Sequence, residues 1–260
     1  MKRVVIGILL VFWAHGGALA QDTNAADGLA RAMAAIAAGD WDVAETHALP
    51  AGQIGADIVT WHRLRASKGE FAEYSAFLSR RSDWPGLPLL RESGESSIPK
   101  GEPATVVIDF FGDQAPRTGN GALRIASALR QQGQQDAADE QVVLAWTSLS
   151  LSEAEEAAFL LQYSGTVKAH HVARQDMLLW RGKTSEAARL DLVLGDDYHK
   201  LGAARAGLLN DASGVDALVR AVPKALRGDP GLAHARFSWR ASKGQTDGAI
   251  EIIRQFSTSA

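Results

Sequence analysis

Cysteine is absent from all 260 residues of the sequence, so no disulfide can stabilise the folded chain. With 46% hydrophobic and 22% charged residues, the chain can instead bury an ordinary hydrophobic core. Long hydrophobic runs are also scarce, since the only one lies within the first twenty residues. We therefore expect no membrane span in the mature chain.

Charge of one sign does not dominate either. The chain has 27 Lys and Arg and 30 Asp and Glu residues, and two of the basic residues lie in the predicted leader. The mature chain then carries 25 basic and 30 acidic residues, a net charge of −5. This balance argues against nucleic acid as a partner and against a polybasic membrane anchor.

The first twenty residues are typical of a secretory signal peptide. Lys2 and Arg3 give a basic start, "VVIGILLVFWA" is an apolar run, and Ala18-Leu19-Ala20 is a cleavage signal of the small-x-small type. We expect residues 1–20 to be removed and the mature protein to be periplasmic. No cysteine follows the leader, which excludes lipid attachment there.

Apolar residues recur at three- and four-residue steps along most of the remaining chain, which indicates amphipathic helices. The strongest candidate for a strand is Val106–Phe111 in "TVVIDFF", and a buried helical turn is an equally good interpretation. The sequences from Arg81 to Pro88, from Ser96 to Ala104 and from Phe111 to Gly121 contain the Pro, Gly and polar residues of loops.

The pentapeptide "RASKG" occurs at residues 65–69 and again at residues 240–244, an offset of 175 or five times 35 residues. This spacing is close to the 34-residue period of two-helix repeats such as the tetratricopeptide. Five glycines open a polar turn before an alanine-rich helix, and each is predicted to be a left-handed helix cap. They are Gly39, Gly69, Gly133, Gly182 and Gly244. We therefore predict an all-α fold, a right-handed superhelix of tetratricopeptide-like helical hairpins, as one domain over residues 21–260.

Several residues invite a catalytic interpretation that the pattern around them does not support. Glu92-Ser93 resembles the Glu-Ser pair of lysozyme-like lyases, but a polar loop is expected to follow, with nothing to build the apolar cleft that raises a catalytic carboxyl pKa. Gly119 and Gly121 resemble half of a dinucleotide fingerprint, whose third glycine would fall at Arg124. A loop entering a helix is the simpler interpretation.

The histidines do not form a metal site by their spacing. His170 and His171 would point about 100° apart on a helix, and His62, His199 and His234 have no partner at ligand spacing. The acidic residues Glu153, Glu155 and Glu156 follow Ser152, where they suit the first turn of a helix. We predict no catalytic, cofactor-binding or metal-binding residue and no cofactor.

Four tryptophans are expected near the ends of helices: Trp61, Trp146, Trp180 and Trp239. Their periodic placement favours packing between neighbouring hairpins. The alternative is that their rings lie on a concave surface and stack against sugars.

Five segments together resemble the N-terminal superhelical region of soluble lytic murein transglycosylases of the proteobacterial type. They are "DWPGLPLLRESGE", "FFGDQAPRTGNGALRIASAL", "AWTSLSLSEAEEAAFL", "HHVARQDMLLWRGKTSEAARL" and "DPGLAHARFSWRASKGQTDGAIEII". The resemblance implies a family that cleaves peptidoglycan with a glutamate of a C-terminal lysozyme-like domain. No residue here matches that catalytic segment.

The resemblance therefore implies the non-catalytic scaffold portion of a periplasmic lytic transglycosylase. Its expected partners are the glycan strands of peptidoglycan and other cell-wall enzymes, and the chain alone is expected to be inactive. The alternative is a stand-alone periplasmic adaptor that binds protein segments in a helical-repeat groove. Ile250, Ile252, Ile253 and Phe256 also predict an uncovered apolar edge in the last hairpin, as in a fragment, a truncated homologue or a self-associating chain.

Overall fold

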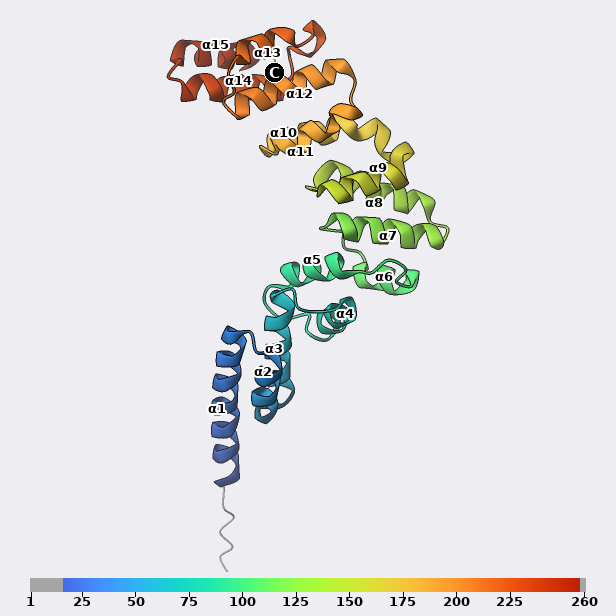
Figure 1. Cartoon of the computed structure of the whole chain (residues 1–260), viewed down its shortest axis with the longest axis vertical. Helices are drawn as coiled ribbons and strands as arrows, with labels where there is room; N and C mark the ends of the chain where they lie inside the picture. Colours follow the sequence, from blue (N-terminus) through green and yellow to red (C-terminus); the bar gives the residue numbers. More distant parts are fainter. Residues whose placement is uncertain (1–15, 258–260) are drawn as a thin grey trace, which may run out of the picture. The chain divides into compact units, whose positions relative to one another are not determined.

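The computed structural model describes residues 16–257, with side chains from residue 23 to residue 256. Throughout this part of the chain the backbone forms helices joined by turns, without a strand (Figure 1). The predicted all-α class is confirmed. Residues 1–15 of the predicted leader lie outside the described residues. Among residues 16–257, no helix is long and apolar enough to cross a membrane.

Packing divides the chain into two compact units, residues 1–94 and residues 95–260. The single domain expected over residues 21–260 stays a prediction. The elements of unit 1 are α1 (Gly16–Ala38), α2 (Trp41–Ala48), η1 (Leu49–Ala51), α3 (Gly52–Arg65), α4 (Phe71–Arg80) and most of α5 (Leu87–Ser97). Its core includes buried residues of α1, α2 and α3, namely Ala32, Ala44, Ala48 and Val59.

Unit 2 contains the remaining helices, coloured from green to red in Figure 1. Its elements are α6 (Ala104–Phe111), α7 (Gly119–Gln131), α8 (Gln135–Ser148), α9 (Glu153–Val167), η2 (Lys168–His170), α10 (His171–Trp180), α11 (Thr184–Ala188), η3 (Arg189–Leu192), α12 (Asp196–Leu209), α13 (Val215–Ala221), η4 (Lys224–Leu226), α14 (Pro230–Ser242) and α15 (Thr246–Ser257).

Helices of unit 2 contact both the next helix and the next helix but one. Helix α7 packs on α8 and α9, α8 on α10, α10 on α12, and α12 on α14. Around α12 and α14 the core is formed by Leu201, Ala204, Leu208, Val215, Val222, Leu232 and Ala235. Burial against two neighbours explains why these helices keep a core of small and branched apolar side chains.

The same turn ends six of the helices. The residue in the left-handed region donates its N–H three residues back, and the next residue donates its N–H five residues back, as in a Schellman motif. The left-handed residues are Gly39, Ser67, Gly133, Gly182, Asp211 and Gly244. After each of the four glycines, the next helix begins two residues later. The predicted caps at Gly39, Gly133, Gly182 and Gly244 are confirmed.

The predicted cap at Gly69 is wrong. In the first "RASKG" the left-handed residue is Ser67, with φ 56°, whereas in the second it is Gly244, with φ 71°. Gly69 is needed for close packing instead, since a Cβ there would lie 2.2 Å from Cδ2 of Leu64. The two copies of the pentapeptide thus end their helices with different residues.

Two further expectations are settled by helix bounds. Val106–Phe111, which could have been a strand, belongs to helix α6. The polar loop expected directly after Glu92-Ser93 is wrong, because α5 continues to Ser97.

The last hairpin has the apolar edge predicted from the sequence. Ile252 is buried, whereas Ile250 and Ile253 are 39% and 51% exposed.

Candidate functional site

A cavity of about 610 Å³ in unit 2 lies among η2, α10, α12, η4 and the turn that precedes α14. Its volume is within the range of small-molecule sites. Polar and apolar side chains share its lining, among them Val172, Gln175, Asp176, Tyr198, Arg205 and Asp229. We call it the α10–α12 cavity, and it is the candidate functional site.

Arg205 of α12 fixes the charges of this cavity. Its side chain is 4% exposed, and Nη1 donates to Oδ1 of Asp176 at 2.6 Å and lies 3.5 Å from Oδ1 of Asp229. Asp229 also caps α14, since Oδ1 accepts the N–H of Leu232 at 2.7 Å. One buried cation is therefore matched by two carboxylates, so the cavity does not offer a free positive charge to an anion.

Two glycines let neighbouring helices pack closely on two side chains that line this cavity. A Cβ on Gly231 of α14 would lie 2.1 Å from Cζ of Arg205, and a Cβ on Gly202 of α12 would lie 2.2 Å from Nε2 of Gln175. Any other residue at either position would displace a lining side chain. The two polar groups therefore owe their places to backbone contacts that only glycine permits.

Trp180 lies beside the same arginine, at the end of α10. Cζ of Arg205 is 5.7 Å from its ring centroid, and the ring of His234 packs against it at 5.0 Å. The core-packing role predicted for Trp180 holds only in part, because its ring packs on His234 of α14 but is 49% exposed. That role is confirmed for Trp146, which is completely buried, while Trp61 and Trp239 are half-buried.

A second hollow lies in unit 1, with a volume of about 390 Å³. Trp61 and Trp84 line it with their rings 6.1 Å apart, together with Ile58, Asp83 and Pro85. The indole N–H of Trp61 is already donated to the carbonyl of Pro85 at 2.9 Å. This hollow therefore offers aromatic surface but fewer polar groups than the α10–α12 cavity.

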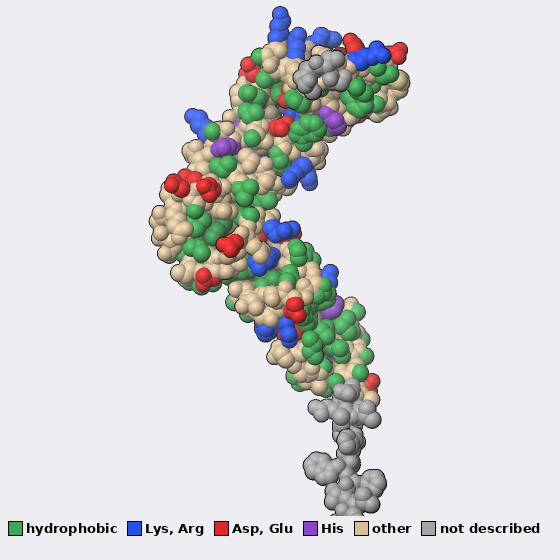
Figure 2. Space-filling view, turned by 180° about the vertical axis from the view of Figure 1, so that it is seen from behind, with side chains coloured by type: hydrophobic (Ala, Val, Ile, Leu, Met, Phe, Trp, Pro, Cys, Tyr) green, Lys and Arg blue, Asp and Glu red, His purple; other side chains and the backbone are tan. Residues whose placement is uncertain are grey.

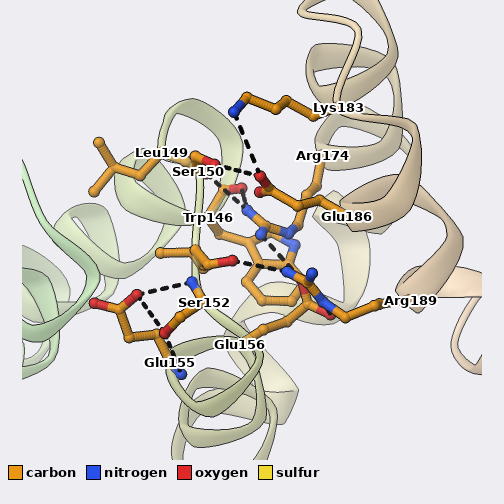
Figure 3. Close-up of polar contacts among 11 residues, drawn as sticks. Trp146, Leu149, Ser150, Ser152, Glu155, Glu156, Arg174, Lys183, Glu186 and Arg189 are labelled. Atoms are coloured by element: carbon orange, nitrogen blue, oxygen red, sulfur yellow. Dashed lines mark hydrogen bonds and ion pairs between the residues drawn. The ribbon is translucent and has the colours of Figure 1, made fainter.

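The acidic residues predicted to begin a helix do so, and one of them also holds a buried ion pair. Ser152 and Glu155 form a capping box at the start of α9. Glu156 accepts from the completely buried Arg174 at 3.0 Å and from Arg189 at 3.2 Å (Figure 3). Burial lowers the pKa of Arg174 despite the carboxylate of Glu156. Arg174 also lies over the ring of Trp146, which makes this cluster part of the core.

The glycines that resembled half of a dinucleotide fingerprint lie at the start of α7, and carboxylates of the chain itself occupy this end. Glu95 accepts the N–H groups of Arg117 and Thr118, each at 2.8 Å, while Glu155 accepts that of Asn120 at 2.9 Å. Burial raises the pKa of Glu95 even though these groups donate to it. The helix start is therefore satisfied internally and is not a phosphate site.

The other residues considered from the sequence are dispersed. Glu92 and Ser93 lie on α5 of unit 1, and His171 packs on Trp146 at 5.5 Å. Within residues 23–256, no three His, Cys, Asp or Glu side chains are grouped as a metal site would require. On the face shown in Figure 2, acidic and basic side chains are interspersed.

Comparison with models of known protein families, with curated proteins and with solved structures gives no match for this chain. The candidate site therefore rests on its own geometry. Sequence reasoning missed Gln175, Asp176, Tyr198, Arg205 and Asp229, because they come from helices α10 and α12 and the start of α14, up to 54 residues apart. Only the glycines at 202 and 231 could have hinted at such close helix contacts.

Proposed function

We propose that this chain is a right-handed superhelix of tetratricopeptide-like hairpins and forms the non-catalytic scaffold portion of a periplasmic lytic transglycosylase. In this role it binds the glycan strands of peptidoglycan beside a catalytic domain and takes part in cell-wall cleavage and turnover. The resemblance of five ordered sequence segments to that family supports the proposal.

The structural observation that carries the proposal is the recurring turn. Six helices end in the same Schellman geometry, and α7, α8, α10 and α12 each pack on the next helix but one. A stack of helical hairpins has this pattern, because each hairpin buries its apolar face against its neighbours only. Stacks of this kind present extended binding surfaces.

Sedimentation with insoluble murein sacculi tests the proposal directly. The mature chain, residues 21–260, is expected to sediment with sacculi and to release no soluble fragments from them. Release of anhydromuropeptides by the purified chain would refute the non-catalytic role. Failure to bind sacculi, together with specific capture of a periplasmic protein, would instead support the stand-alone adaptor.

A further inference from the structure

The lining of the α10–α12 cavity carries more negative than positive charge. Asp176 and Asp229 contribute two carboxylates, and Arg205 is the one cation among the lining residues that the structure describes. Nη1 of Arg205 lies 2.6 Å from Oδ1 of Asp176 and 3.5 Å from Oδ1 of Asp229. Since one guanidinium is shared by two carboxylates, the lining keeps one negative charge in excess.

The two carboxylates are also more accessible than the guanidinium. The side chain of Arg205 is 4% exposed, whereas those of Asp176 and Asp229 are 47% and 21% exposed. The guanidinium lies against the backbone of Gly231, with Cζ 5.7 Å from the ring centroid of Trp180. A molecule that enters the cavity therefore meets negative charge, while the positive charge is covered by protein.

Both carboxylates keep an oxygen that can accept a hydrogen bond. Oδ1 of Asp176 accepts from Arg205, and Oδ1 of Asp229 accepts from the N–H of Leu232. Within residues 23–256, no group donates to Oδ2 of either aspartate. Because an ionised carboxylate accepts through both of its oxygens, an incoming N–H donor finds two acceptors here.

The rest of the lining is largely apolar, which restricts the kind of cation that fits. Val172, Leu201 and Leu226 line the cavity, together with the aromatic ring of Tyr198. A bare metal ion such as Ca²⁺ needs six to eight oxygen ligands, which two carboxylates on a carbon-rich wall do not supply. An organic cation instead places its N–H groups on the carboxylates and its carbon atoms on the apolar wall, and an aromatic ring also attracts it.

From this lining we infer that the α10–α12 cavity binds an organic cation of the alkylammonium or alkylguanidinium class. Its charged end lies at Asp176 and its alkyl part packs against Val172 and Leu226. This binding does not depend on the proposed function, because the charge and shape of the cavity alone account for it. A volume of about 610 Å³ has room for a small cation or for a basic side chain of a partner protein, which share this chemistry.

NMR titration of residues 21–260 with butylguanidinium and with butylurea tests the charge requirement, because butylurea is an uncharged molecule of nearly the same shape. We expect butylguanidinium to bind about tenfold more tightly, since hydrogen bonds to charged groups are the stronger ones. It should shift the amide signals of Asp176 and Leu226, and added salt should weaken it. Equal affinities for the two molecules would overturn the inference.

Replacing Asp176 tests the position of the charged end. Asp176→Asn should weaken the binding of butylguanidinium about tenfold, because it removes the charge that the ligand pairs with. Asp136→Asn is the matched control, since Asp136 is exposed in the first turn of α8 and lies outside the cavity. An unchanged affinity in Asp176→Asn would overturn the assignment of the charged end.

A second pair of variants leaves the pairing of Arg205 with Asp176 in place. Val172 is 37% exposed, lines the cavity and precedes Asp176 by one helical turn on α10. Val172→Lys should abolish the binding of butylguanidinium by placing a cation of the chain at the same carboxylate. Val172→Met adds a long side chain without charge and should keep most of the affinity. Equal affinities in these two variants would contradict the inference.

A capped Ala-Arg-Ala tripeptide distinguishes the two sources of the cation. Tighter binding of the tripeptide than of butylguanidinium would assign the cavity to a basic side chain of a partner protein. Weaker binding of the tripeptide would assign it to a free small molecule. Binding of neither at millimolar concentration would overturn the inference.

Discussion

Replacing Glu156 by Gln should destabilise the protein by removing one charge without changing the shape of the side chain. Glu156 is 4% exposed and is the carboxylate partner of Arg174, which is completely buried. Loss of one partner of a buried ion pair generally costs about 3–5 kcal/mol, because the other charge is left uncompensated. The structure indicates the lower end of this range.

Two carbonyl groups and one aromatic ring remain around Arg174 after the substitution. Nη1 donates to the carbonyl of Trp146 at 2.8 Å and to that of Leu149 at 3.1 Å, and Cζ lies 4.4 Å from the ring centroid of Trp146. The other partner of Glu156, Arg189, is 28% exposed and can be solvated. We therefore expect a loss of about 3 kcal/mol in the free energy of unfolding.

Urea unfolding followed by circular dichroism measures this loss. Glu153→Gln is the matched control, because Glu153 lies in the same first turn of α9 but is exposed. The control subtracts the interaction of a carboxylate with the helix dipole, which is worth about 0.3–1 kcal/mol. Adding Arg174→Met to Glu156→Gln should recover much of the loss, since no unpaired charge is then buried. Equal stabilities of Glu156→Gln and Glu153→Gln would refute the reasoning.

The two glycines of "RASKG" should respond oppositely to Asn, as measured by urea midpoints. Gly244→Asn should cost less stability than Gly244→Ala, because Asn tolerates the left-handed region. Gly69→Asn should cost more than Gly69→Ala, because Gly69 is in close contact with Leu64 and Asn is the larger side chain. Gly231→Ala should lower the free energy of unfolding by about 1–3 kcal/mol, because its Cβ would displace the guanidinium of Arg205. The control Gly228→Ala has open space around it and should change this free energy by no more than about 0.5 kcal/mol. Equal losses in the two variants would contradict the close packing at Gly231. Burial first, and then neighbouring positive charges, lower the pKa of His171 below its ordinary 6.5, so its contribution to stability is present above pH 6.5 and is lost as the pH falls through the lowered pKa. Urea midpoints measured across that window should fall less steeply in His171→Asn, and an unchanged slope would contradict this assignment.

Local chemistry made much of this fold predictable. The helical periodicity predicted an all-α chain, and Gly39, Gly133, Gly182 and Gly244 were expected at the turns where the structure has them. Such features depend on a few neighbouring residues, so the sequence displays them directly. Gly69 shows the limit of this reasoning, because its role is set by the distant contact of its backbone with Leu64 and not by the pentapeptide around it.

The candidate site was not predictable in the same way. A catalytic motif would have been a short string, but the α10–α12 cavity joins Gln175, Arg205 and Asp229, which belong to three separate segments. Each of these residues alone is typical of a solvated helix face. Only the packing of α10 on α12 and of α12 on α14 brings them into one lining.

The glycine contacts show how two polar side chains fit between closely packed helices. At both Gly202 and Gly231 the missing side chain makes room for a polar group, the carboxamide of Gln175 and the guanidinium of Arg205. Glycine within a helix costs about 0.5–1 kcal/mol relative to alanine. At Gly231 the ion pairs of Arg205 with Asp176 and Asp229 offset this cost. Gly202→Ala should therefore lower the urea midpoint, because its Cβ would lie 2.2 Å from Nε2 of Gln175, and a midpoint equal to that of the unmodified chain would contradict this close contact.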